Sequence, residues 1–258
     1  MRRKVKVKET NVIQSVGRAI EILKCFNEKE ELGVSEISRM MNLHKSTTFG
    51  LITTLEVYKL LEKNEQNNKY RLGIELFTLG SKVKSDLKSV AASYLDSLVK
   101  TYEETAHLVT KDGYKVIYLD KIESTHSMRI CSRVGERLPI YCTGVGKAIL
   151  ANLPEDELKE ILDNIKMEKI TANTIAVREE LLKHLQIVRD QGYAEDLEEI
   201  EMGLKCVAAP IFDHTNKAVA AISVAGPAVR MTDETRKRIA ATLMIYTKEI
   251  SKKLGYKA

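Results

Sequence analysis

The sequence predicts an α+β protein: an N-terminal winged helix-turn-helix in residues 1–72, a helical linker in 73–88 and a C-terminal α/β domain in 89–258. Three observations lead to this prediction. Two short amphipathic helices with a tight turn between them precede a small hairpin, a proline-free helical stretch follows, and the rest of the chain mixes apolar strands with amphipathic helices. The length of 258 residues fits one large domain or two ordinary ones.

The first predicted helix covers residues 12–27, after a charged segment, 1–10, that we expect to be disordered. Its apolar face is expected to carry Val16, Ile20, Leu23 and Cys25/Phe26, which recur at helical spacing.

The second predicted helix begins after Gly33, because Glu36 three residues on gives the spacing of a capping box. Asn42 can adopt the left-handed conformation of a tight turn between helices, and Leu43 then returns to the core. The apolar stripe of this helix is expected at Val34, Ile37, Met40 and Met41.

A third helix is predicted over residues 45–58, with Phe49, Ile52 and Leu55 on its buried side. Two short strands, 60–63 and 69–72, then flank the polar turn 64–68. This order of elements is that of a winged helix-turn-helix.

Positive charge is concentrated in the N-terminal part. Residues 1–84 hold 16 Lys and Arg against 10 Asp and Glu, a net charge of +6, whereas residues 85–258 hold 25 against 26, a net charge of −1, and together they give the chain's +5. Such a distribution indicates contact with a polyanion, most simply nucleic acid, although many solvated faces carry extra lysines.

The third helix begins with His44-Lys45-Ser46-Thr47-Thr48. A recognition helix needs short polar groups at its N-terminus, and hydroxyls bond both bases and phosphates. The predicted DNA contacts are Lys45, Ser46, Thr47 and Thr48, with Lys63, Lys69 and Arg71 in the wing and Arg18 on the first helix. The alternatives are that the hydroxyls only cap a helix and that the wing is an ordinary charged hairpin.

The linker is predicted to be helical over 74–84 and to continue into a longer helix, 87–102. In the C-terminal part, strands are predicted at 115–122, 128–133, 206–212 and 218–225. Helices are predicted at 146–152, 155–164 and 179–190, and a last helix is predicted to follow an N-cap at Thr232. The turn Asp213-His214-Thr215-Asn216 is the strongest hairpin signal in the chain.

Several protein classes find no support in the sequence. The basic N-terminus lacks a following apolar region, no apolar run reaches the length of a membrane span, and the four cysteines form no CxxC pair. We therefore expect a cytoplasmic protein with reduced thiols, without cofactor or metal and without enzymatic activity. An enzyme with a thiol site at Cys142, Cys206, His107 and Asp196 remains an alternative, as do an architectural DNA-binding protein and a partner-binding module.

Six segments resemble the IclR family of bacterial regulators over about residues 12–255. They are QSVGRAIEIL (14–23), SEISRMMNLHKST (35–47), YRLG (70–73), RVGERLPIYCTGVGKAILA (133–151), QGYAEDLEEIEMGLKCVAAPIFD (191–213) and AVAAISVAGP (218–227). One position departs from the family pattern. Gly50 stands where the family usually carries a basic residue, so the resemblance does not supply that DNA contact.

The resemblance implies a GAF-like C-terminal domain that binds a small effector, a homodimer or homotetramer, and control of genes for organic-acid catabolism, with repression more common than activation. The effector site that it implies consists of Ile130, Leu138, Gly144, Val145, Asp196, Leu204, Cys206, Ser223 and Ala225.

The residues themselves give this site a chemical rationale. Backbone N–H groups around 144–146, before a predicted helix, suit a carboxylate, and Ser223 is a hydroxyl in an otherwise apolar strand. The alternatives are that the glycines only form a turn, that Cys206 is a core residue and that Asp196 caps a helix or pairs with a lysine. The function we expect is that of a regulator whose affinity for a double-stranded DNA operator is changed by a small carboxylate.

Overall fold

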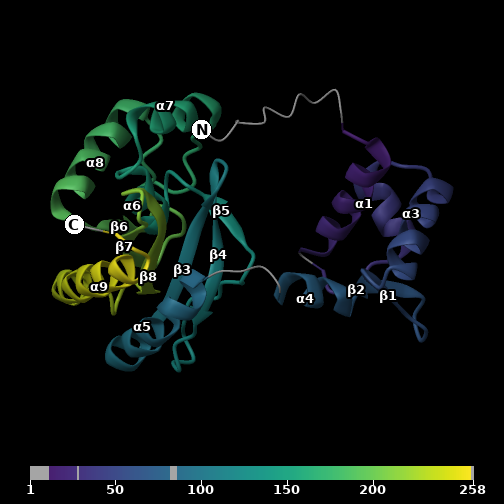
Figure 1. The fold of residues 1–258 in the computed structure, drawn as a ribbon, viewed down its shortest axis with the longest axis horizontal. Helices are drawn as coiled ribbons and strands as arrows, with labels where there is room; N and C mark the ends of the chain where they lie inside the picture. Colours follow the sequence, from purple (N-terminus) through teal and green to yellow (C-terminus); the bar gives the residue numbers. More distant parts are fainter. Residues whose placement is uncertain (1–11, 28, 82–85, 257–258) are drawn as a thin grey trace. The chain divides into compact units, whose positions relative to one another are not determined.

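A computed structural model describes residues 12–27, 29–81 and 86–256. They form two compact units, one before and one after residues 82–85 in the sequence (Figure 1). Residues 1–10, for which disorder is expected, lie outside the described residues, and so does the middle of the expected linker. No helix in the described ranges is both long and apolar enough to cross a membrane.

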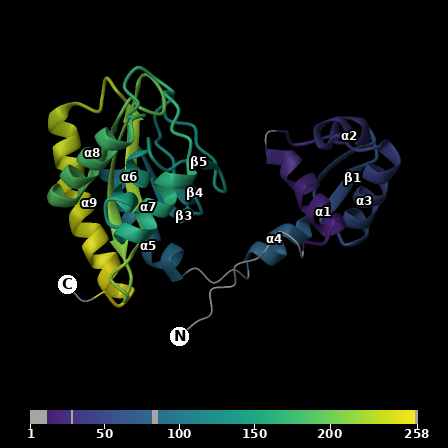
Figure 2. The ribbon, with the colours of Figure 1, turned by 90° about the horizontal axis from the view of Figure 1, so that it is seen from above.

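The N-terminal unit contains three helices, a hairpin and a further helix. They are α1 (Gln14–Lys24) with a 3-10 turn (Cys25–Asn27), α2 (Val34–Met41), α3 (Lys45–Val57), β1 (Leu61–Asn64), β2 (Lys69–Leu72) and α4 (Ile74–Ser81). Helices α1, α2 and α3 gather around one core (Figure 2), whose fully buried side chains include Ile22, Leu32, Ile37 and Ile52. The antiparallel hairpin β1–β2 completes the predicted winged helix-turn-helix.

Local chemistry sets the boundaries of α2 as predicted. The backbone N–H of Gly33 donates to Oε2 of Glu36 at 2.9 Å, which is one half of a capping box. Asn42 has φ of 50° and ends the helix in the left-handed region.

Four residues predicted to face the core are exposed instead: Val16, Ile20, Met40 and Phe49. In α1 the buried face is centred on Ile22, and Val16 and Ile20 belong to a second apolar stripe on the same helix. Met40 and Phe49 are 54% and 53% exposed, because the core of α2 and α3 is built on Ile37, Ile52 and Leu55.

The C-terminal unit is built on a six-stranded antiparallel sheet. Its strands are β3 (Thr105–Asp112), β4 (Lys115–Ile122), β5 (Arg137–Pro139), β6 (Ala194–Leu197), β7 (Leu204–Phe212) and β8 (Ala218–Pro227), in the spatial order β5-β4-β3-β8-β7-β6. The helices are α5 (Asp86–Tyr102), α6 (Gly144–Leu150), α7 (Glu155–Asn164), α8 (Arg178–Gln191) and α9 (Asp233–Lys253). This mixture of helices with an antiparallel sheet confirms the α+β class.

Helices cover both faces of the sheet (Figures 1 and 2): α5 and α9 on one face, and α6, α7 and α8 on the other. Alternate residues of a strand point to opposite faces. In β8, Ile222 and Val224 pack against α5 and α9, so Ser223 and Ala225 point to the side of α6. This alternation places the functional side chains of neighbouring strands together.

The predicted strand at 128–133 is wrong, because these residues form a loop. Strands β3, β5 and β6 were not predicted. Thr105 and His107, both buried, interrupt the apolar pattern of β3, and Glu195 and Asp196 give the short β6 a low strand propensity.

Candidate functional site

The first turn of α3 presents polar side chains on the surface of the N-terminal unit. Lys45, Ser46 and Thr47 are exposed, as a recognition helix requires. Thr48 is different: it is fully buried, and its hydroxyl donates to the carbonyl of His44 at 3.1 Å. The predicted DNA contact at Thr48 is therefore corrected, because its hydroxyl is committed inside the helix.

The basic residues of the wing each face a carboxylate. Arg71 forms two hydrogen bonds to Glu62, at 2.9 and 3.2 Å. The Lys63 ammonium lies 3.8 Å from Glu65, and that of Lys69 lies 3.7 Å from Glu36. These side chains remain solvent-accessible, so a phosphate would compete with the carboxylates for them. Arg18 is half-buried on α1.

Gly50 lies on the exposed surface of α3. A Cβ atom built on it meets no other atom within 4 Å. Packing within the described chain therefore does not require glycine at this position of α3.

A cavity of about 130 Å³ opens on the α6 side of the C-terminal sheet. All nine residues of the predicted effector site line it: Ile130, Leu138, Gly144, Val145, Asp196, Leu204, Cys206, Ser223 and Ala225. Eight further residues complete the wall: His107, Tyr118, Cys131, Ser132, Glu136, Thr143, Ile200 and Glu201.

Strand register explains why residues distant in sequence meet at this cavity. Asp196 on β6 lies opposite Cys206 on β7, Cys206 lies opposite Ala225 on β8, and Ser223 on β8 lies opposite His107 on β3. Directly paired residues point to the same face of a sheet. The four strands therefore provide a continuous floor.

The start of α6 forms a wall very close to that floor. A Cβ at Gly144 would lie 3.2 Å from Sγ of Cys206, which a larger side chain would displace. The hydroxyl of Thr143 caps the helix by accepting from the N–H of Gly146 at 3.2 Å. That N–H is therefore committed within the turn, which leaves the N–H groups of Gly144 and Val145 for the anion contact expected around 144–146.

His107 is the centre of a polar chain in the cavity that was not predicted as an effector contact. Its Nε2 lies 2.8 Å from Oγ of Ser132, and its Nδ1 lies 3.5 Å from Oγ of Ser223. Burial, with a smaller effect from the charge of Lys121, lowers the pKa of His107 to about 3, so the ring is neutral at pH 7. The edge contact with Tyr118, at 5.0 Å between ring centroids, fixes its orientation.

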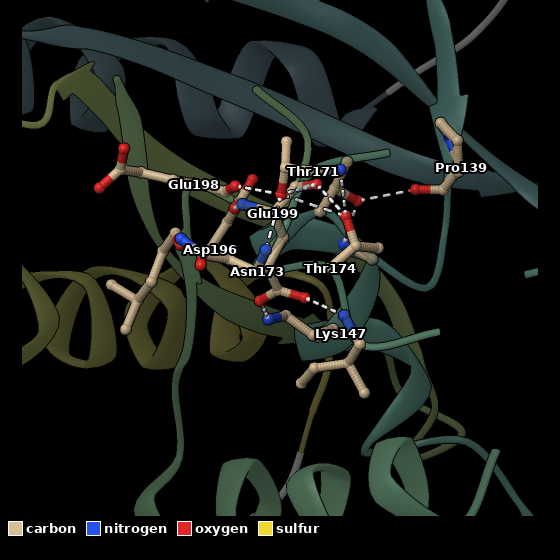
Figure 3. Close-up of polar contacts among 12 residues, drawn as sticks. Pro139, Lys147, Thr171, Asn173, Thr174, Asp196, Glu198 and Glu199 are labelled. Atoms are coloured by element: carbon tan, nitrogen blue, oxygen red, sulfur yellow. Dashed lines mark hydrogen bonds and ion pairs between the residues drawn. The ribbon is translucent and has the colours of Figure 1, made fainter. Parts of the chain in front are cut away.

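Behind the cavity lies a buried polar cluster around Glu199 (Figure 3). The Lys147 ammonium, which is 0% exposed, donates to Oε1 of Glu199, while the N–H of Glu199 donates to Oδ1 of Asp196 at 2.7 Å. Thr171 and Thr174 donate to backbone carbonyls of the same segment, at 2.7 and 2.6 Å. These bonds hold the segment after β6, which contributes Ile200 and Glu201 to the wall, in one conformation.

Part of this wall could have been found from the sequence. Thr143 stands directly before the Gly144–Gly146 turn, as an N-cap does. His107 and Ser132 carry no such signal, because only the register of unpredicted β3 and the loop after β4 bring them to the cavity. Tyr118 lies on β4, which was predicted, but its place at the cavity depends on the pairing of β4 with β3.

Known protein families and individual proteins match this chain over nearly its whole length. Residues 15–65 match the IclR helix-turn-helix domain, and residues 81–252 match the bacterial transcriptional regulator IclR C-terminal domain. The HTH-type transcriptional regulator XynR of Escherichia coli (strain K12) is 38% identical over 96% of this chain and 99% of its own length. The HTH-type transcriptional repressor AllR of Salmonella typhimurium is 33% identical over 95% and 91%.

Solved structures give the same result. The IclR protein of Thermotoga maritima superposes with a TM-score of 0.78 and 36% identity, over 94% of this chain and 99% of that one. Helix-turn-helix regulators bind DNA, and IclR C-terminal domains bind small-molecule effectors. The chain belongs to the IclR family of DNA-binding bacterial transcriptional regulators.

Proposed function

We propose that this regulator represses transcription from an operator, and that a small organic acid bound in the C-terminal cavity changes its affinity for that operator. The observation that carries the proposal is the cavity itself, which all nine expected effector residues line. Repression is favoured because AllR, a relative over nearly the whole chain, is named a repressor.

A small carboxylate fits the chemistry of the cavity. The hydroxyls of Ser132 and Ser223, both held by the neutral ring of His107, offer hydrogen bonds to a ligand, while Gly144 and Val145 provide the first turn of α6. Apolar walls with a few converging polar groups are typical of ligand sites. A volume of about 130 Å³ limits the effector to a few carbon atoms unless the wall moves.

A homodimer, or a tetramer built from dimers, would serve this function. An exposed apolar stripe on and before α1 offers a surface for a second copy and consists of Val12, Ile13, Val16 and Ile20. Two recognition helices would then read half-sites one helical turn apart, or a multiple of it. The effector shifts the equilibrium between two conformations only by its difference in affinity for them.

The exposed ammonium of Lys45 is expected to contact a phosphate. Lys45→Ala should weaken operator binding and reduce the slope of log K against log salt by about one unit, because one fewer counterion is released. The measurement is fluorescence anisotropy at several salt concentrations, with a DNA fragment from upstream of the gene that encodes this chain. Lys183→Ala, an exposed lysine of α8, is the control, and an unchanged slope for Lys45→Ala removes this role.

The cavity is expected to be needed for the effector response but not for DNA binding. Ser223→Leu fills the floor beside His107 and should abolish the response to organic acids while operator affinity stays near wild type. The measurement is operator binding with and without a panel of such acids. Ser93→Leu on the exposed surface of α5 is the control. Loss of operator binding in Ser223→Leu alone would mean that Ser223 is structural.

A further inference from the structure

One Lys, one Asp and one Glu side chain are buried together behind and in the cavity: Lys147, Asp196 and Glu199 (Figure 3). The single cation is committed to Glu199, whose second oxygen accepts from the N–H of Ile175 at 3.4 Å. Asp196 is held by the N–H of Glu199 at 2.7 Å and is the carboxyl that lines the cavity. The pairing thus leaves Asp196 without an ion-pair partner of its own among the described residues, and the charge of Lys147 lowers its pKa less than burial raises it.

The cavity wall does not supply that countercharge. Of the described residues that line it, none is Lys or Arg, whereas Glu136 and Glu201 add two acidic groups on its exposed side. His107 is neutral, because burial lowers its pKa to about 3. A carboxylate that entered beside an ionised Asp196 would meet a like charge at low dielectric, which costs far more than it does in water.

We propose that Asp196 is the proton-carrying group of the effector cavity, so that a carboxylate effector binds together with one proton shared between its own oxygen and the side chain of Asp196. This inference rests on the proposed function. The proton comes from solvent, no covalent bond forms or breaks, and the bound pair carries one negative charge instead of two. An O–H···O⁻ hydrogen bond of this kind is among the strong ones in proteins.

Three titratable neighbours of Asp196 do not change charge in the relevant pH range. The titratable groups that face it are Lys147 on α6, Glu199 in the following segment, Cys206 on β7, Cys142 before α6 and Tyr118 on β4. Burial raises the pKa of the Cys142 and Cys206 thiols to about 12, and it also raises that of the Tyr118 phenol. These three groups therefore stay neutral from pH 6 to 8.

Burial also raises the pKa of Asp196, to about 7. Below pH 7 the free protein already carries the proton, and above it each binding event must take one up. The dissociation constant of a carboxylate should therefore rise about tenfold between pH 6.0 and pH 8.0, since one proton is linked to binding. Simple carboxylic acids are themselves ionised throughout this range.

The test compares carboxylates with their neutral amides: formate with formamide, glycolate with glycolamide, pyruvate with pyruvamide and benzoate with benzamide. Calorimetry on the full chain at pH 6.0 and 8.0 should show that the carboxylate binds about tenfold more weakly at the higher pH, whereas the affinity for the amide does not change. Asp196→Asn should remove the pH dependence, because its amide donates a hydrogen bond at every pH. Asp156→Asn, on the exposed surface of α7, should behave as wild type.

Equal carboxylate affinity at both pH values overturns the proposal. If Asp196→Asn does not fold, the wild type is titrated with the carboxylate at pH 8.0 in HEPES and in Tris. The measured binding heats should differ, because nearly one proton is taken from the buffer and the two buffers ionise with different enthalpies. Equal heats in the two buffers overturn the inference. If no carboxylate binds at either pH, this inference fails. Operator binding then shows whether the DNA-binding part of the proposed function stands without it.

Discussion

Lys147→Met is expected to lower the free energy of unfolding by about 3–5 kcal/mol, because it leaves the carboxylate of Glu199 buried without its cation. Methionine preserves most of the volume of the lysine, so the lower free energy of unfolding would come mainly from the lost charge and not from a cavity. Glu199 also accepts from the N–H of Ile175. The whole segment after β6 should therefore loosen. Urea unfolding of the full chain, followed by circular dichroism, measures the effect.

Two further variants make this result specific. The double variant Lys147→Met/Glu199→Gln removes both charges and should recover most of the loss, because the cost lies in the uncompensated charge. Lys100→Met breaks the exposed pair with Asp96, whose atoms are 2.6 Å apart, and should change stability by less than about 0.5 kcal/mol. Equal losses in Lys147→Met and Lys100→Met would contradict the assignment of a buried pair.

Gly146→Ala is expected to destabilise the C-terminal unit. A Cβ at Gly146 would lie 1.9 Å from the carbonyl oxygen of Ile140, a backbone atom that cannot rotate away. Overpacking typically costs about 1–3 kcal/mol and occasionally more, and a contact this short with a backbone atom favours the upper end of that range. Since the same turn places Gly144 and Val145 in the cavity wall, effector binding should fall as well. Thermal unfolding and ligand calorimetry measure the two effects.

Gly50→Ala is the matched control in the other unit. Its Cβ would meet no atom within 4 Å, so alanine should stabilise α3 by about 1 kcal/mol through its higher helix propensity. A loss of stability in Gly50→Ala, or none in Gly146→Ala, would mean that the space around these glycines differs from that in the structure.

Sequence reasoning succeeded where local chemistry or a long motif decides the outcome. The capping pair of Gly33 and Glu36 and the left-handed Asn42 follow from side chains within a few residues. The nine residues expected at the effector site line one cavity, and they could be named together because they lie in motifs that resemble the family.

It failed where tertiary packing decides. Periodicity marks an apolar stripe but does not say whether another element covers it, which is why Val16, Ile20 and Phe49 are exposed. Thr48 was expected at DNA because it follows two exposed hydroxyl residues, yet its position on α3 turns it into the core. His107 reaches the cavity only through the pairing of β3 with β8, which no local pattern encodes.

The most direct test of the account is operator binding by the full-length wild-type chain as organic acids are added. The DNA is the region upstream of the chain's own gene, and a scrambled fragment of equal length and composition is the control. We predict preference for the upstream fragment and a change in its affinity of about 5–150-fold when the effector is present. Equal affinity for both fragments, or an affinity that no acid alters, would contradict the central claim.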